Sequence, residues 1–153
     1  MRWKISETGE VAMKKKNLEV DIKVPNQTRY LSLIGRIGED IAKELDRFTG
    51  NRETLAHHIN LVLTEAMANA IKYAGTENPQ KMVHICITIC ADDILMKVFD
   101  NGQGFDINSI PPPNFEELED RGRGIFIIRS LMDSVTYKKL SDGNVLIMSK
   151  KLK

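Results

Sequence analysis

The chain has 153 residues, of which 42% are hydrophobic and 28% are charged, and its formal net charge is +1. This length is typical of one domain with a substantial core, and the composition excludes a wholly disordered chain. A net charge near zero argues against a surface dedicated to nucleic acid, so the short basic runs near the two ends are interpreted as solvated tails. The sequence has neither the run of about eighteen apolar residues expected of a membrane helix nor a signal peptide. We therefore expect a cytoplasmic protein without a membrane contact.

The amino-terminal residues carry little structural signal. Residues 1–16 are polar and patternless, and they predict a flexible tail ahead of a single domain over residues 17–153. Whether the first twelve residues are native is left open, because Met13 offers a second start. Residues 18–24 alternate between apolar and charged side chains, which predicts a strand with one buried face that ends at Pro25.

Two helices are predicted after this strand. Asn26 is of a type that caps helices, and apolar residues recur at helical spacing over 30–48. Gly35 and Gly38 lower the helix propensity there by up to about 1 kcal/mol each. Their presence is interpreted as allowing either close packing or local flexibility, and the sequence leaves both open. After a break, a second helix is expected over 52–74.

The rest of the chain predicts mainly strands. The expected segments are a strand over 83–90, a strand over 94–100, a loop over 106–121 with one short helical turn, a helix over 125–132, and a hairpin formed by 135–140 and 145–150. This order indicates an α+β fold: a two-layer sandwich of a mostly antiparallel mixed sheet with helices on one face.

The two cysteines are predicted to be reduced. Cys86 and Cys90 lie four residues apart in one predicted strand, which places them on one face but about 13 Å apart. A disulfide needs Cα atoms within about 7 Å, so the two thiols cannot bridge each other. For the same reason they cannot easily share one zinc ion, even with His84 nearby.

The second predicted helix carries two polar residues within an apolar run, Glu65 and Asn69. They are four residues apart, so they project from one face, one turn apart. Both offer oxygen donors suited to a hard cation such as Mg²⁺, and a glutamate can also act as a base. This stretch alone leaves two interpretations open: a polar seam that meets solvent, or a metal and acid–base site.

A first glycine-rich turn follows a predicted strand. Gly102 and Gly104 come directly after Asp100, and glycine allows positive φ and close approach of the backbone to a ligand. The pattern is not a Rossmann fingerprint, because Ile107 stands where the third glycine is required, and the chain contains no Walker A motif. Such a glycine pair on its own is also typical of a simple tight turn.

A second glycine-rich turn, Arg-Gly-Arg-Gly at residues 121–124, precedes the last predicted helix. A helix N-terminus attracts anions, and the two arginines add positive charge at the same place. Taken with Glu65, Asn69 and the turn after Asp100, it indicates a nucleotide site. The second helix would hold the metal and this turn the phosphates.

Three motifs carry a resemblance to a known family. They are E-A-x-x-N-A at 65–70, D-N-G-x-G-F at 100–105 and G-R-G-I-F-I-I at 122–128. They resemble the N, G1 and G2 boxes of the GHKL ATPase superfamily. Within it, the chain resembles the anti-sigma factor serine/threonine kinases of bacterial partner-switching systems, over roughly residues 18–152.

The resemblance implies the Bergerat, or histidine-kinase-like ATPase, fold and the use of ATP and Mg²⁺. It also implies a homodimer and two kinds of protein partner. One is a sigma factor, which the kinase holds inactive. The other is an anti-anti-sigma protein of the STAS fold, which the kinase phosphorylates on Ser.

The resemblance also implies roles for individual residues. Asn69 would bind Mg²⁺, and Glu65 would be the general base toward the substrate Ser or would reach the metal through water. Asp100 would accept a hydrogen bond from the adenine amino group. Either Arg121 or Arg123 would stabilise charge on the transferred group. The remaining positions expected at the nucleotide are Tyr73, Gly102, Gly104, Phe105, Gly122, Gly124 and Ile125.

Two other functions are weighed against the kinase. The first is an ATP-binding partner-switch module without significant phosphotransfer, which Glu65 disfavours because a pure binder has no need of a base beside its metal ligand. The second is a sensor histidine kinase fragment, disfavoured because no preceding dimerisation helix with a phosphoacceptor His is found; His57 and His58 are expected to be surface or packing residues. Tyr73 departs from the resemblance, since the family often has His there.

Overall fold

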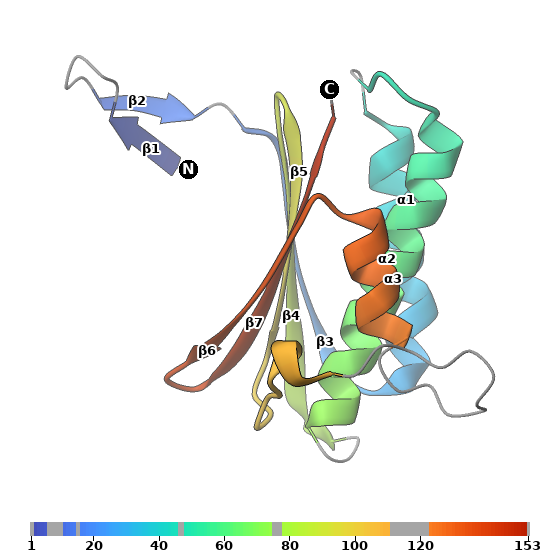
Figure 1. Cartoon of the computed structure of the whole chain (residues 1–153), viewed down its shortest axis with the longest axis vertical. Helices are drawn as coiled ribbons and strands as arrows, with labels where there is room; N and C mark the ends of the chain where they lie inside the picture. The colour runs from blue at the N-terminus through green and yellow to red at the C-terminus, as the bar shows by residue number, and fades with distance from the viewer. Residues whose placement is uncertain are drawn as a thin grey trace.

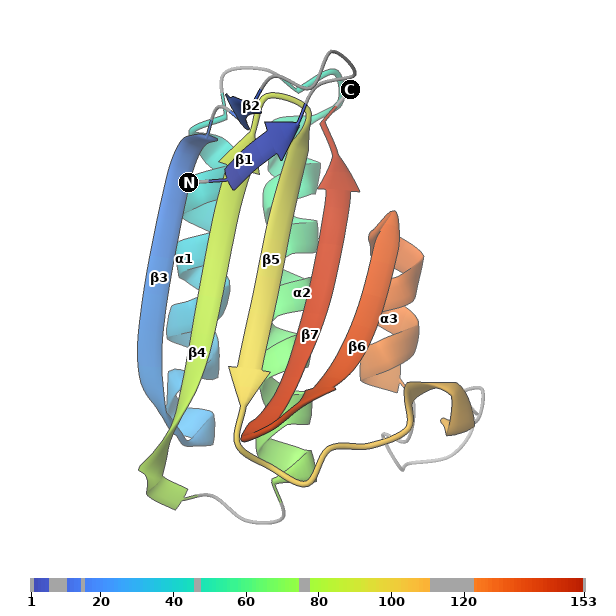
Figure 2. The ribbon, with the colours of Figure 1, turned by 90° about the vertical axis from the view of Figure 1, so that its left-hand side faces the viewer.

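The structure is a computed structural model that describes residues 2–5, 11–14, 16–45, 48–74, 78–110 and 123–152. Its main body has two layers, a five-stranded antiparallel sheet and three helices that all cover one face of it (Figures 1 and 2). The strand order is β3-β4-β5-β7-β6. The elements are β3 (Lys16–Asn26), η1 (Thr28–Tyr30), α1 (Leu31–Lys43), α2 (Arg52–Tyr73), β4 (Asn78–Cys90), β5 (Asp93–Asp100), η2 (Ile107–Ser109), α3 (Arg123–Leu131), β6 (Ser134–Leu140) and β7 (Gly143–Lys151). The predicted α+β sandwich is confirmed, and every pairing within this sheet is antiparallel.

The amino-terminal segment differs from the prediction. Residues predicted to lack regular structure form two short strands, β1 (Arg2–Ile5) and β2 (Val11–Lys14), which pair with each other and not with the main sheet. Figure 1 shows this pair on the side of the sheet away from the helices. Four residues are too few for a periodic signal, which is why the sequence missed both strands. The predicted domain boundary near residue 16 stays a prediction.

The core lies between the sheet and the helices. Alternate residues of β4 and β5 face it, as period-two patterning requires, and Val83, Ile85, Ile87, Ile94 and Met96 are all 0% exposed. From the helical layer, α2 contributes Leu55, Ala56, Ile59, Val62, Leu63, Ala66, Met67, Ala70 and Ile71. Burial on so many sides confirms that α2 is a central helix with only a narrow polar seam.

The glycines of α1 serve close packing. A Cβ on Gly38 would meet the side chains of Leu63 and Ile59 on α2, and one on Gly35 would meet Asn60 and Thr64. Both glycines are buried. The alternative of local flexibility, left open by the sequence, is therefore not needed to explain them.

Asn26 does not cap a helix, contrary to the prediction. It is the last residue of β3 and is 3% exposed, while α1 begins at Leu31 after the 3₁₀ turn η1. Asn26 is displaced from the helix start because the chain first turns through η1. Asn51 caps α2 instead, because its side chain accepts a hydrogen bond from the amide of Thr54 at 3.1 Å.

The last two strands close as the predicted hairpin. Leu140 pairs with Gly143, so the turn between them has two residues. Gly143 has φ 157°, and a Cβ there would collide with the backbone carbonyl of Asp100. The hairpin tip therefore packs closely against the end of β5, which brings Asn144 beside the D-N-G-x-G-F loop.

Candidate functional site

The polar seam of α2 contains a buried polar atom that needs a partner. Glu65 and Asn69 lie one turn apart on α2 and are partly buried. The side-chain amide nitrogen Nδ2 of Asn69 is buried, and no hydrogen bond to it is found among the described residues. Buried polar groups are nearly always paired, and an amide NH₂ group donates, so this unpaired donor points to an acceptor oxygen of a ligand or water at this place. Carboxylate and amide oxygens fit a hard divalent cation.

The N-terminus of α3 faces this seam. Gly124 is the second residue of α3, and a Cβ built on it would lie 2.8 Å from Oε2 of Glu65 and 3.3 Å from Nδ2 of Asn69. Glycine is therefore required here by the closeness of the two helices. The first amide groups of a helix carry partial positive charge and have no partner within the helix. The fold thus brings an anion-attracting helix end to the oxygen donors of α2.

A second part of the site lies at the end of β5. Oδ1 of Asp100 accepts a hydrogen bond from the amide of Gly102 at 2.8 Å and another from Nδ2 of Asn144 at 3.1 Å. Nδ2 of Asn144 also donates to the carbonyl of Gly102 at 2.9 Å. Both bonds to Asp100 fall on one carboxylate oxygen, so Oδ2 keeps its capacity to accept a bond from a ligand. Asn144 holds both the acid and the turn.

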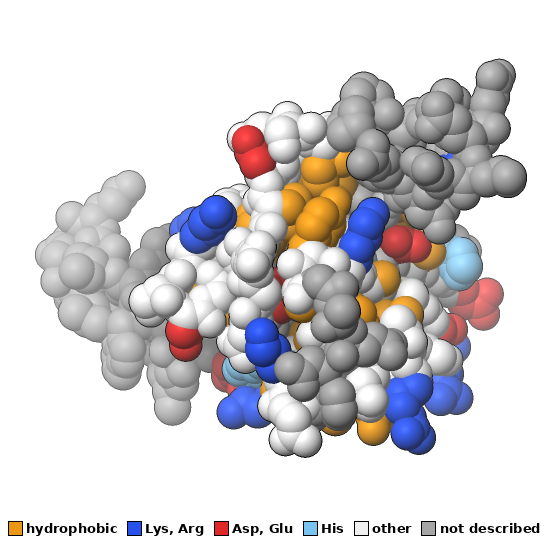
Figure 3. Space-filling model, turned by 90° about the horizontal axis from the view of Figure 1, so that it is seen from below, with side chains coloured by type: hydrophobic (Ala, Val, Ile, Leu, Met, Phe, Trp, Pro, Cys, Tyr) orange, Lys and Arg blue, Asp and Glu red, His pale blue; other side chains and the backbone are white. Residues whose placement is uncertain are grey.

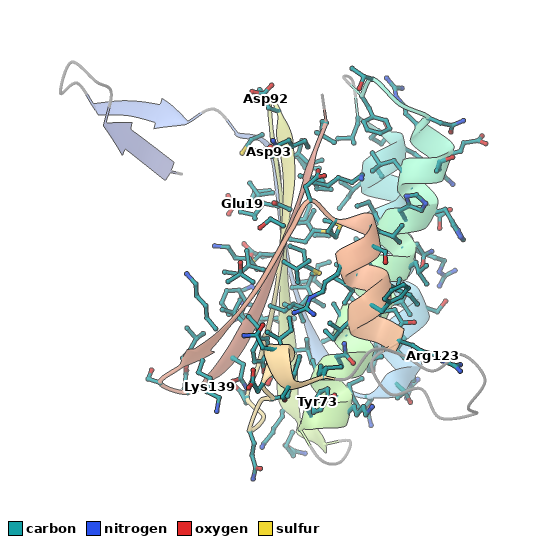
Figure 4. The ribbon with its side chains drawn as sticks, in the orientation of Figure 1. Glu19, Tyr73, Asp92, Asp93, Arg123 and Lys139 are labelled. Carbon is teal, nitrogen blue, oxygen red and sulfur yellow. The ribbon has the colours of Figure 1, made fainter. Side chains whose placement is uncertain are left out.

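Three aromatic rings pack beside this loop. Phe105 stacks on Tyr73 with ring centroids 4.2 Å apart, and on its other side contacts Tyr137 at 4.4 Å. Figure 4 shows Tyr73 at the end of α2 that lies toward the β6–β7 hairpin tip. Gly104, at φ 81°, adopts a conformation that favours glycine, and a Cβ on it would lie 2.9 Å from the Tyr137 hydroxyl. The loop is thus packed between α2 and β6.

Burial raises the pKa of the Tyr137 hydroxyl to about 12, and the negative charge of Asp100 acts in the same direction, as does the neighbouring Tyr73. A hydrogen bond with the backbone of Phe105 acts in the opposite direction. The ring therefore stays neutral at physiological pH. It supplies a polar but uncharged group next to the loop.

Several expected residues are placed differently. Arg121 and Gly122 lie outside the described residues. Arg123 starts α3 on the helical side of the molecule (Figure 4), and its contribution to a phosphate site stays a prediction. Ile125 is 3% exposed and belongs to the core, so only its backbone is suited to contact a ligand.

Two residues of the site were missed by sequence reasoning. Asn144 was interpreted as part of the hairpin turn and Tyr137 as an ordinary strand residue, yet both contact the D-N-G-x-G-F loop. The available signal was an Asn directly after the turn glycine. It indicated a turn as strongly as it indicated a site.

The surface at this end of the molecule is uneven. Figure 3 looks onto it and shows hydrophobic side chains gathered in a hollow, with basic side chains at its sides. An apolar hollow with a few polar groups and flanking cations is the character expected of a site for an aromatic base joined to phosphates.

Comparison with known proteins agrees with this geometry. The family described as histidine kinase-like ATPase domain matches residues 25–150. A solved histidine kinase domain from the blue-light activated histidine kinase of Erythrobacter litoralis EL346 superposes with a TM-score of 0.52 at 18% identity, over 84% of this chain. This chain spans 61% of that structure's length, and the likeness concerns the fold.

Curated relatives are closer in sequence. The anti-sigma F factor of Heyndrickxia coagulans is 35% identical over 70% of this chain and 71% of its own. The serine-protein kinase RsbW of Staphylococcus aureus strain JH9 is 30% identical over 92% and 91% of the two chains, and that of Oceanobacillus iheyensis is 26% identical over 86% and 85%. The chain belongs to the histidine kinase-like ATPase family, and within it to the group that contains these anti-sigma factors and serine-protein kinases. None of its described helices is long and apolar enough to cross a membrane.

Proposed function

We propose that this protein is an ATP-dependent protein-serine kinase that also acts as an anti-sigma factor. The observation that carries the proposal is the meeting of Glu65, Asn69 and the glycine-opened end of α3. This arrangement supports the proposal, because it would bring a base, a metal ligand and a phosphate-binding helix end together. The names of the relatives, anti-sigma F factor and serine-protein kinase RsbW, support the same function.

Phosphoryl transfer depends mainly on positioning and on charge stabilisation, and this site has groups for both. Asn69 would hold Mg²⁺, which when bound offsets the negative charge of the phosphates. Glu65 would accept the proton of the substrate Ser hydroxyl. The Ser oxygen would then bond to the γ-phosphorus of ATP, while the bond between that phosphorus and the leaving ADP breaks. The first amides of α3 would hold phosphate oxygens, as would Arg121 or Arg123.

The other end of the site would select adenine. Oδ2 of Asp100 would accept a hydrogen bond from the 6-amino group, a donor that guanine lacks at that position. Asn144 supports this role, because its bond to Oδ1 fixes the carboxylate plane. Gly102, Gly104 and Phe105 would form the surface on which the nucleotide lies.

The partners are proposed from the family. A sigma factor is the first, in keeping with the anti-sigma F factor among the relatives. A STAS-domain anti-anti-sigma protein phosphorylated on Ser, a homodimer and a cytoplasmic location follow from the motif resemblance and stay predictions.

The decisive experiment is label transfer. Purified protein would be incubated with γ-³²P-ATP, Mg²⁺ and a STAS-domain protein from the same genome, and label on the STAS protein would be measured. Glu65→Gln should retain ATP binding and lose transfer, whereas Asn69→Ala should lose Mg²⁺-dependent ATP binding. Glu53→Gln is the matched control, because Glu53 is an exposed glutamate of the same helix.

Three outcomes would separate the alternatives. No transfer by wild type at saturating Mg²⁺, with ATP bound, would support a partner-switch module without phosphotransfer. Equal ATP affinity in wild type and Asn69→Ala would refute the metal assignment. Transfer by Glu65→Gln at the wild-type rate would refute the base.

A further inference from the structure

A cluster of three different ligand types lies on the sheet face opposite to the helices. Asp21 of β3 and His84 and Cys86 of β4 place one atom each within 4.8 Å of the other two. The thiol of Cys86 donates to Oδ1 of Asp21 at 2.7 Å, and Nε2 of His84 lies 3.0 Å from the same oxygen and 3.3 Å from Sγ. The cluster is separate from the nucleotide site, which is built on the helical face.

The three atoms converge on one point rather than forming a chain. In a Cys–His–Asp catalytic triad, the thiol and the carboxylate contact opposite ring nitrogens of the imidazole. Here Sγ and Oδ1 both approach Nε2 and also each other. Three different ligand atoms in mutual contact can serve a shared cation once the thiol proton is lost, which a linear triad cannot do.

Strand register produces the cluster. Asp21 pairs directly with Cys86, and His84 lies two residues from Cys86 on the same face of β4. The ring of Phe99 on β5 stacks on His84 with centroids 5.3 Å apart and an interplanar angle of 22°. The imidazole is therefore oriented by packing against Phe99.

We propose that Asp21, His84 and Cys86 bind a divalent cation of the zinc class, with one coordination position open to water or to a donor from another molecule. Thiolate, imidazole and carboxylate together favour Zn²⁺ over Mg²⁺ or Ca²⁺, which prefer all-oxygen sets. On binding, the Cys86 thiol loses its proton to solvent and the sulfur–metal bond replaces the hydrogen bond to Asp21. The two resulting negative charges match the dication.

The present geometry is close to that of a loaded site. Tetrahedral zinc with bonds of about 2.0–2.3 Å separates its ligand atoms by about 3.4–3.6 Å. The three atoms therefore need to open by less than about 1 Å from their spacings of 2.7, 3.0 and 3.3 Å. The side chains of His84 and Asp21 are 33% and 56% exposed, so they can make this adjustment.

The charges around the cluster are mixed. Lys97 of β5 is paired with Cys86, and Lys23 is paired with His84. Burial and the hydrogen bond to Asp21 raise the pKa of the Cys86 thiol to about 12, and Lys97 opposes this rise. Glu19 lies on the same side of the sheet as Asp21, and Figure 4 shows it on the face without helices. The nearby carboxylates offset the lysines, and the site remains suited to a cation.

The test is cobalt spectroscopy on the full chain without a histidine tag. Co²⁺ is the probe, because tetrahedral coordination with a thiolate gives intense visible bands and a sulfur-to-metal charge-transfer band. We expect one equivalent of Co²⁺ to produce these bands, Zn²⁺ to remove them, and millimolar Mg²⁺ to leave them unchanged. Zn²⁺ should also raise the thermal midpoint of the ATP-free protein.

Variants localise the site. Cys86→Ser should abolish the charge-transfer band, and His84→Ala should weaken Co²⁺ binding at least about tenfold. Cys90→Ser, a buried cysteine of the same strand, is the matched control and should keep the bands. His58→Asn tests the adjacent His57–His58 pair as a competing site. Circular dichroism confirms that each variant is folded.

Two results would overturn the proposal. The first is the absence of cobalt bands from folded wild-type protein at millimolar Co²⁺ under reducing conditions. The second is persistence of the charge-transfer band in Cys86→Ser, or its loss in Cys90→Ser or His58→Asn instead.

Discussion

Asn144 of β7 clamps Asp100 of β5: its Nδ2 donates to Oδ1 of Asp100 at 3.1 Å and to the carbonyl of Gly102 at 2.9 Å. One side-chain amide thus joins the acid that would read adenine to the turn that follows it. The β6–β7 hairpin is thereby part of the candidate site, although no residue of it belongs to the three motifs.

Removing this clamp should weaken ATP binding. Asn144→Ala leaves Asp100 without one of its two orienting hydrogen bonds. We expect the binding free energy of ATP to weaken by about 1–2 kcal/mol, which corresponds to about a tenfold rise in the Kd for ATP. Calorimetric titration measures it, with Asn108→Ala, an exposed asparagine of η2, as control. An unchanged Kd would show that Asn144 only shapes the turn.

A methyl group at Gly124 should impair transfer without unfolding the protein. In Gly124→Ala, the new Cβ would lie 2.8 Å from Oε2 of Glu65, so the carboxylate must move. Because transfer depends on its alignment, we expect kcat to fall by about tenfold or more. Alanine is also the better helix former. Ser130→Ala, exposed on the same helix, is the control and should keep the wild-type kcat. A wild-type kcat in Gly124→Ala would contradict the role of Glu65 as the base.

Gly38→Ala should lower stability. The added methyl group would meet the fully buried Leu63 and would lie 2.9 Å from Cγ2 of Ile59. Overpacking costs about 1–3 kcal/mol, which exceeds the gain in helix propensity of up to about 1 kcal/mol. Urea denaturation measures the change. Ser32→Ala, exposed on α1, is the control and should leave the stability unchanged or raise it. Equal stability of the Gly38→Ala and Ser32→Ala variants would mean that α1 and α2 can move apart without an energetic cost.

Tyr137 makes stability depend on pH in the alkaline range. Its folded-state pKa is raised to about 12, so its contribution to stability is fully present below its ordinary pKa of 10.0 and is lost as the pH rises toward 12. Tyr137→Phe should remove this part of the decline, measured as the difference between the two urea-denaturation profiles. Asp100→Asn should lower the pKa of Tyr137 in an absorbance titration, because a charge that disfavours tyrosinate is removed. Parallel pH profiles of wild type and Tyr137→Phe would refute the coupling.

Sequence periodicity predicted the elements whose apolar residues recur at the spacing of a helix or a strand. The expected helix over 52–74 is α2 (Arg52–Tyr73), and the hairpin around Gly143 has the predicted turn. Errors arose where a neighbour overrode a local preference: Asn26 ends β3 instead of capping α1, because η1 intervenes.

The sequence by itself determined the α+β order of elements, the three motifs and hence the family, because periodicity, turn glycines and motif spacing are local properties. Only the tertiary structure decided that Gly124 faces Glu65, that Asn144 holds Asp100, and that Asp21 meets His84 and Cys86. These contacts join residues from 42 to 65 positions apart in the sequence. They depend on strand register and helix packing, which the folded core sets and no single segment encodes.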